Sequence, residues 1–147
     1  MRIITCVKIK PGVNIQIIFD SGANHHVFNN IQLFRNLRNN DKVEITTADG
    51  TVSTSTKIGD VYWLKDVHYA PELQSNVISI TQLDRLGFYF VIKNQKLKLF
   101  IKENNLILTS HMKHELYTIT NIELAAISNK NFSQTAQTNL EIAVPLA

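Results

Sequence analysis

The sequence predicts an all-β domain with a single short helix in its second half. Short runs in which apolar and β-branched residues alternate with polar ones recur along the chain, and this period of two is typical of half-buried strands. Clusters of turn-forming residues separate the runs. With 147 residues, 44% of them hydrophobic, the chain is long enough for one domain with a buried core.

The first half of the chain contains two predicted hairpins. The runs "IITCVKI" (3–9) and "VNIQIIF" (13–19) flank the turn-like tripeptide "KPG". In "KVEITTADGTVSTSTKI" (42–58), two alternating runs meet at Asp49-Gly50. This dipeptide favours a tight hairpin, because both of its positions tolerate a positive φ. The next segment, "GDVYWLKDVHYAP" (59–71), is predicted to form one further strand that ends at Pro71.

The clearest helix signal lies in "NVISITQLDRLGF" (76–88). Ser79 is the predicted N-cap, with Gln82 as its partner in a capping box. Ile78 and Leu83 occupy the positions of a hydrophobic staple. Gly87 is placed to end the helix.

Four strand-like runs follow the helix, at 88–92, 96–101, 106–110 and 115–119, with turns expected at 93–95 and 103–105. After Thr120 the sequence becomes polar and aperiodic, as in "SNKNFSQTAQTN". We therefore expect the folded domain to span residues 1–120, and residues 121–147 to form a polar tail or linker.

One apolar run ends abruptly in a possible chemical site. In "IQIIFDSGANHH" (15–26), an apolar strand is followed directly by Asp20, Ser21 and Gly22. These three residue types also form plain turns. An acid presented at the end of a buried strand is nevertheless what aspartic proteolysis requires, with Ser to brace the loop and Gly to let the backbone turn beside the carboxylate.

The series of motifs from Ile17 to about Tyr117 resembles the protease segment of copia-type retrotransposon Gag-Pol polyproteins, which are retroviral-type, pepsin-like aspartic proteases. "FDSGANHHVF" resembles that family's Asp-Ser-Gly-Ala-Ser/Thr-x-His-Met, and "TTADGT" resembles its flap segment Gly-Asp-Gly-Ser/Thr. "LKDVHYAPELQSNVISITQL" resembles Leu-x-x-Val-x-Tyr-x-Pro-x-Leu-x-x-Asn-Leu-Leu-Ser-Ile-x-x-Leu, and "HELYTI" resembles the later Gly-Leu-Tyr segment. The chain departs from the family pattern at Asn24, Val27, Ala48 and Glu72, of which Glu72 is expected on a surface turn.

The resemblance implies a retropepsin-like closed barrel with a flap hairpin and one short helix. Its implied catalytic residues are Asp20, Ser21 and Gly22, and its implied substrate-binding residues are Ala23, Asn24, Ala48, Asp49, Gly50 and Thr51. Since the chain holds one Asp-Ser-Gly, a carboxylate dyad needs two chains, and we expect a homodimer with Asp20 on the two-fold axis. The first strands and those after Gly87 are candidates for the sheet between the chains.

The same resemblance implies a polyprotein substrate, the Gag-Pol precursor, cleaved in the cytoplasm within virus-like particles. The tail would lead toward a pre-integrase region that the sequence does not include. We expect no cofactor, no metal and no membrane span. The net charge of +3 includes no dense basic cluster, so direct nucleic-acid binding is not expected.

Several residues have plainer interpretations. His25 and His26 are adjacent, so on an extended chain they point to opposite faces and do not suit one metal ion. We expect His26 to be a structural hydrogen-bonding residue behind the loop, and Trp63 to be a packing residue. Cys6 is expected in the core rather than as a nucleophile. His111 and His114 are expected on the surface near a strand connection.

Two alternatives to the protease remain open on the sequence alone. The first is a co-opted, catalytically inactive protease-like dimer that acts as a binding or structural module. The second is a β-barrel that binds extended peptides as a monomer. The intact Asp20-Ser21-Gly22 motif favours the enzyme over the first of them.

Overall fold

A computed structural model describes residues 14–47, 50, 52–101 and 105–127 of the chain. Within these ranges the strands are β1 (Gln16–Asp20), β2 (Val27–Phe28), β3 (Arg35–Thr46), β4 (Val52–Val61), β5 (Leu64–Tyr69), β6 (Asn76–Ser79), β7 (Tyr89–Lys93), β8 (Lys96–Ile101), β9 (Asn105–Lys113) and β10 (Leu116–Thr120). The helices are a 3-10 turn η2 (Ile31–Leu33), α1 (Ile80–Arg85) and α2 (Asn121–Ile127). The prediction of a mainly β protein is confirmed.

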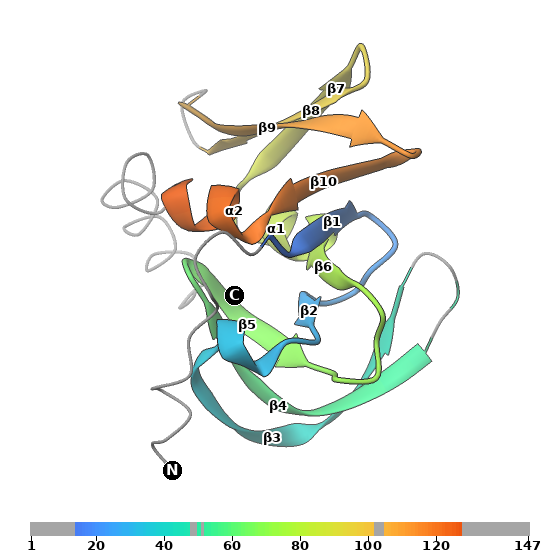
Figure 1. Ribbon diagram of the computed structural model, residues 1–147, viewed down its shortest axis with the longest axis vertical. Helices are drawn as coiled ribbons and strands as arrows, with labels where there is room; N and C mark the ends of the chain where they lie inside the picture. Colours follow the sequence, from blue (N-terminus) through green and yellow to red (C-terminus); the bar gives the residue numbers. More distant parts are fainter. Residues whose placement is uncertain (1–13, 48–49, 51, 102–104, 128–147) are drawn as a thin grey trace.

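The described strands pair in the order β3-β4-β5-β2-β6-β1-β10-β9-β8-β7. In Figure 1 the strands β7–β10 lie at one end of the molecule and β3–β5 at the other, with β1, β2 and β6 between them. The strands at the two ends of this order, β3 and β7, each pair with a single neighbour. The closed barrel that the resemblance implied is therefore not formed by the hydrogen bonds of the described strands.

Strand β1 occupies the centre of this sheet. It pairs in parallel with β6 and antiparallel with β10. The side chains of Ile17 and Phe19 are buried in the main core, as the alternation of the strand predicts. The burial of this strand fixes the position of Asp20, its last residue.

The pairing of β10 with β1 bears on the prediction that strands after Gly87 form a sheet between two chains. Strands β8, β9 and β10 each have neighbours within the chain on both sides. Of the strands after Gly87, β7 alone keeps one edge without a partner strand among the described residues. The first predicted strand, at 3–9, lies outside the described residues, as does Cys6.

The predicted hairpin around Gly50 is confirmed. Strands β3 and β4 run antiparallel, with Thr46 opposite Val52. Gly50 has a φ of +86°, and its N–H donates to the carbonyl of Thr47 over 2.9 Å. A glycine suits this position because a left-handed backbone costs it nothing. Ala48, Asp49 and Thr51 of the same turn lie outside the described residues.

The segment 59–71 was predicted as one strand, and this is wrong. The chain turns at Tyr62 and Trp63 between β4 and β5, and Val61 pairs with Leu64. Tyr62 takes a φ of +54°, an unfavourable value for an aromatic residue. Tertiary contacts stabilise this turn, because Trp63 is buried, stacks on Phe88 and donates its indole N–H to the carbonyl of Leu124 over 3.0 Å.

Helix α1 has the predicted boundaries. The Ser79 side chain accepts a hydrogen bond from the backbone N–H of Gln82. At the other end, the N–H of Gly87 donates to Asp84 and that of Phe88 to Leu83, which is the Schellman arrangement. The left-handed φ of +96° at Gly87 makes this ending possible.

A second helix follows β10 at residues that were expected in the tail. The predicted fold had one helix, whereas residues 121–127 form α2. Thr120 and Glu123 form a reciprocal capping box, with each side chain accepting the other residue's backbone N–H over 3.1 Å and 2.8 Å. Leu124 and Ile127 are buried in the main core. This part of the predicted tail is therefore folded, and residues 128–147 lie outside the described residues.

The remaining strands follow the prediction closely. The turn between β7 and β8 is built by Asn94 and Gln95, both with positive φ, within the predicted 93–95. Residues 103 and 104 of the other predicted turn lie outside the described residues. His114 and Glu115, also with positive φ, join β9 to β10. No helix among the described residues is long and apolar enough to cross a membrane.

Candidate functional site at the end of strand β1

Asp20 lies where β1 ends and a short loop begins. It is half-buried, and in the parallel pairing its register partner is Ser79 at the end of β6. Its Oδ1 atom accepts the backbone N–H of Gly22 over 2.7 Å. This contact is a turn closed by the Asp side chain, and it restricts the orientation of the carboxylate.

Ser21 and Gly22 are exposed beside Asp20. Gly22 does not have a positive φ, so its role here is the N–H that it donates to Asp20 rather than a left-handed turn. The carbonyl of Ser21 accepts the Thr81 hydroxyl over 3.4 Å. The predicted catalytic residues are therefore together in one loop that contacts helix α1.

Ala23 and Asn24 have structural partners. Ala23 is buried, and its carbonyl accepts the Ser79 hydroxyl over 2.8 Å. The Asn24 side chain accepts the N–H of Thr46 over 3.2 Å and donates to the carbonyl of Glu44 over 3.3 Å. Asn24 thus joins the Asp20 loop to the end of β3 that leads into the β3–β4 turn. A contact of either residue with substrate stays a prediction.

A cleft of about 630 Å³ opens beside Asp20. This volume is within the range of small-ligand and peptide-side-chain pockets. Its apolar lining comes from Ile18, Phe19, Leu73, Val77 and Leu116, and its polar lining from Asp20, Ser21, Thr47, Glu72, Gln74 and Ser75. The cleft combines an apolar surface with a small number of polar groups, which is typical of a binding site.

Sequence reasoning predicted Asp20 and Ser21 among the cleft residues and missed the others, of which Glu72, Thr47 and Leu116 are the most informative. Glu72 lies on an exposed turn, as predicted, but the sequence did not indicate that this turn contributes its carboxylate to the cleft lining. Thr47 and Leu116 reach the cleft from the β3–β4 hairpin and from β10. For Thr47, its position directly before the predicted hairpin turn was a usable sequence signal. Nothing in the local sequence predicts that β10 lies beside β1.

His26 supports the loop from inside the protein, as predicted. It is 1% exposed, and its Nδ1 atom accepts the backbone N–H of Ser79 over 2.9 Å. Its own backbone N–H donates to Oε1 of Gln82 over 2.8 Å. The predicted capping box is therefore half formed, because the Gln82 side chain binds His26 instead of returning to Ser79.

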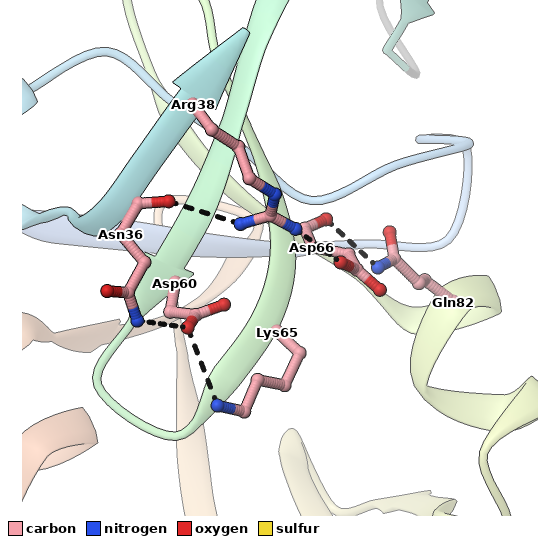
Figure 2. Close-up of polar contacts among 6 residues, drawn as sticks. All are labelled: Asn36, Arg38, Asp60, Lys65, Asp66 and Gln82. Carbon is pink, nitrogen blue, oxygen red and sulfur yellow. Dashed lines mark hydrogen bonds and ion pairs between the residues drawn. The ribbon is translucent and has the colours of Figure 1, made fainter. Parts of the chain in front are cut away.

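Gln82 also connects the loop to strand β5. Figure 2 shows its Nε2 atom donating to the carbonyl of Asp66, over 3.3 Å. The Asp66 carboxylate forms an ion pair with Arg38 at 3.5 Å, and both side chains are largely exposed. Such a pair adds little stability by itself. The contact that positions the Asp20 loop relative to β5 is the hydrogen bond from Gln82 to the Asp66 carbonyl.

Figure 2 also shows a second cluster of polar contacts, which joins the start of β3 to β4 and β5. Asp60 is buried, and its Oδ2 atom accepts from Asn36 over 3.2 Å and from Lys65 over 3.4 Å. These contacts satisfy a carboxylate that would otherwise be costly to bury. They hold the end of the β3–β4 pair at which Asn36 takes a positive φ.

Three histidines gather behind the loop. Burial, together with His25 and His68, lowers the pKa of His26 to about 3. Burial, then His25, lowers the pKa of His68 to about 4. The pKa of His25 is lowered by burial and by the positive charge of Arg85. All three rings are therefore neutral at pH 7.

This group of histidines does not form a metal site. The rings of His25 and His68 pack edge to face with centroids 4.7 Å apart. Nδ1 of His68 is buried without a hydrogen-bond partner in the described part of the chain. Among the described residues, no set of three or more His, Cys, Asp and Glu is placed to hold a metal ion.

Comparison with known protein families matches part of the chain. A family model described as the Pol polyprotein, beta-barrel domain, matches residues 17–88. Residues 17–88 are therefore similar to this domain of retroelement Pol polyproteins. The Pol match begins in β1 and ends just after α1, so it includes the Asp20 loop, the β3–β4 hairpin and His26, whereas β7–β10 and α2 lie outside it. No curated protein and no solved structure matches the chain.

Proposed function

We propose that this chain is the aspartic endopeptidase of a copia-type retrotransposon polyprotein, or of a gene derived from one. The observation that carries this proposal is the position of Asp20. It ends a buried central strand, its carboxylate is oriented by the Gly22 N–H, and it lines a cleft beside a β-hairpin. The relation to Pol polyproteins supports the same reading for residues 17–88.

The proposed mechanism uses two Asp20 carboxylates, one from each chain of a homodimer of retropepsin type. Two carboxylates about 3 Å apart share one proton, because they cannot both be ionised at that distance. The ionised carboxylate takes a proton from a water molecule, which attacks the peptide carbonyl. The protonated one donates to the oxyanion that develops and the leaving amine finally takes up a proton. The products are a carboxylic acid and an amine.

The proposed substrate is an extended segment of the Gag-Pol precursor. It would lie in the cleft beneath the β3–β4 hairpin, where main-chain pairing gives affinity and the apolar lining gives selectivity. In this proposal the hairpin acts as a flap that covers the substrate, with Gly50 in its turn. The predicted contacts of Ala48, Asp49 and Thr51 belong to the same proposal.

Dimerisation would couple cleavage to concentration. A site completed by a second chain forms in proportion to the dimer, by mass action. In a virus-like particle the polyprotein is concentrated, so cleavage would follow assembly. This proposal includes the cytoplasmic location and the homodimer, and it needs neither a cofactor nor a metal ion.

A second candidate is a binding module without catalysis. The observation in its favour is that the cleft beside Asp20 combines an apolar lining with a small number of polar groups, which suits the binding of a peptide. Such a cleft could hold an extended peptide without a second Asp20.

Expression of a precursor that contains this segment, compared with the Asp20→Asn variant, separates the two candidates. A protease cleaves the first precursor and leaves the second intact, whereas a binding module leaves both intact. A strictly monomeric protein at high concentration, measured by analytical ultracentrifugation, would contradict the dimeric dyad.

A further inference from the structure

Ser79 is the residue through which β6, helix α1 and the Asp20 loop are joined. Its backbone N–H donates to Nδ1 of His26 over 2.9 Å, and its hydroxyl donates to the carbonyl of Ala23 over 2.8 Å. The same hydroxyl accepts the N–H of Gln82 at the start of α1. Ser79 is also the register partner of Asp20. A displacement of the Ser79 backbone therefore acts directly on Asp20, its partner in the sheet.

The hydrogen bond from the Ser79 N–H to Nδ1 of His26 forms only when the imidazole is neutral. A neutral imidazole accepts at one nitrogen and donates at the other, whereas a protonated one donates at both. Since Nδ1 accepts the Ser79 N–H, the ring proton is on Nε2. Protonation of Nδ1 would set two N–H groups against each other in a site that is 1% exposed.

The groups around His26 do not compensate a positive charge. The neighbouring His25 is on the same loop, and His68 reaches the ring from β5. Helix α1 contributes the Gln82 amide, bound at the His26 backbone, and Arg85, which acts on His25. Strand β6 contributes Ser79. None of the carboxylates in the described ranges makes a hydrogen bond or ion pair with His26.

We propose that neutral His26 is the positioning residue of the Asp20 site, and that protonation of its ring releases the loop from Ser79 and sets an acid limit to the working site. The regulatory part of this inference rests on the proposed protease function. The structural part does not, because it concerns the bond between His26 and Ser79. The lowered pKa of His26, caused first by burial, agrees with a ring held in its neutral form.

The structural part is tested by amide hydrogen exchange of the full chain, measured at Ser79. If opening the loop exposes His26 to water, the open state binds a proton that the closed state excludes. The protection factor of the Ser79 amide, corrected for the intrinsic rate, then falls by about tenfold for each pH unit below about 6.5. A protection factor at Ser79 that is constant between pH 7 and pH 4.5 would overturn the proposal.

The matched variant is His26→Asn, whose side-chain oxygen can accept near the position of Nδ1 and does not titrate. Its Ser79 protection is expected to be independent of pH over this range. The control is His111→Asn, an exposed histidine on β9, which should keep the wild-type slope. If His26→Asn keeps that slope, another group causes it and the proposal fails.

Should His26→Asn fold poorly, the wild-type chain still decides the question. An NMR titration follows the His26 ring carbons and the Ser79 amide together, and the proposal predicts one shared midpoint well below the ordinary histidine value of about 6.5. Unlinked midpoints, or a midpoint for His26 near 6.5, would contradict it.

A cleavage assay then tests the regulatory part. For a peptide that the wild-type chain cleaves, His26→Asn should move the acid limb of the kcat profile to lower pH with little change in KM. If the wild-type chain cleaves nothing, the proposed protease function fails, and the exchange data still decide the role of His26. If it cleaves and both limbs coincide, His26 does not limit the site in acid.

Discussion

The backbone N–H of Gly22 donates to Oδ1 of Asp20 over 2.7 Å, two residues along the chain. The contact turns the chain directly after strand β1 and orients the carboxylate at the cleft. The loop after β1 therefore has a structural requirement for a side-chain oxygen at position 20, separate from any chemical requirement for an acid.

These two requirements are separated by a pair of substitutions. Asp20→Asn keeps an oxygen that can accept the Gly22 N–H, whereas Asp20→Ala removes it. We expect Asp20→Ala to lower the free energy of unfolding by about 1 kcal/mol relative to Asp20→Asn, the usual value of one hydrogen bond. Urea unfolding of both variants measures this difference. Equal stability of the two would show that the loop does not depend on this bond.

Helix α2 is expected to contribute strongly to stability. Leu124 is fully buried, so Leu124→Ala should lower the free energy of unfolding by about 2–5 kcal/mol through lost burial and the cavity left behind. Ile122 lies on the same helix with 49% of its surface exposed, and Ile122→Ala should change stability by less than about 0.5 kcal/mol. Similar losses for the two variants, in urea unfolding, would mean that α2 does not pack as described.

The buried histidines predict a loss of stability in acid. Because burial lowers the pKa of His26 to about 3, the unfolded chain binds a proton below its ordinary pKa of 6.5 that the folded chain excludes. Stability is thus complete above about pH 6.5 and falls as the pH decreases toward 3, by about 2 kcal/mol between pH 7 and pH 5 from His26 alone. His68, with a pKa of about 4, adds an effect of the same sign.

Urea unfolding at pH 7 and pH 5 measures this loss. His26→Asn should show a smaller difference between the two values of pH than the wild-type chain. A wild-type protein that is equally stable at both would contradict the neutral, buried state of these rings.

Glu72 is expected to select substrates by charge. It is an exposed carboxylate in the cleft lining and makes no ion pair with any described residue. For a peptide with Lys or Arg beside the scissile bond, Glu72→Gln should lower kcat/KM by about two- to fivefold, the size of an exposed ion pair. Neutral peptides should be unaffected, and Asp41→Asn, on the exposed part of β3, is the control. Equal effects on both peptide classes would argue against charge selection.

Local sequence signals predicted the features that are themselves local. The Asp49-Gly50 dipeptide placed the β3–β4 hairpin, and Ser79 and Gly87 placed the two ends of α1. In each case the residue type satisfies backbone groups or a positive φ within a few residues, so tertiary contacts are not needed to predict it.

The features that sequence reasoning missed depend on distant partners. The turn at Tyr62 contains no Gly, Asn or Asp, and contacts of Trp63 with Phe88 and Leu124 stabilise it. The role of Glu72 depends on how the loop after β5 lies beside β1. Helix α2 is different, because Thr120 and Glu123 are a capping-box pattern that the sequence displays and that the polar residues beyond it obscured.

Asp20 is proposed as the catalytic carboxylate of a polyprotein protease, and precursor processing tests this claim most directly. A precursor that contains residues 1–147 with its flanking regions is expressed beside its Asp20→Asn variant, and the products are resolved by mass. Processing of the first precursor and an intact, folded second precursor is the predicted result. The same cleavage products from both precursors would contradict the claim.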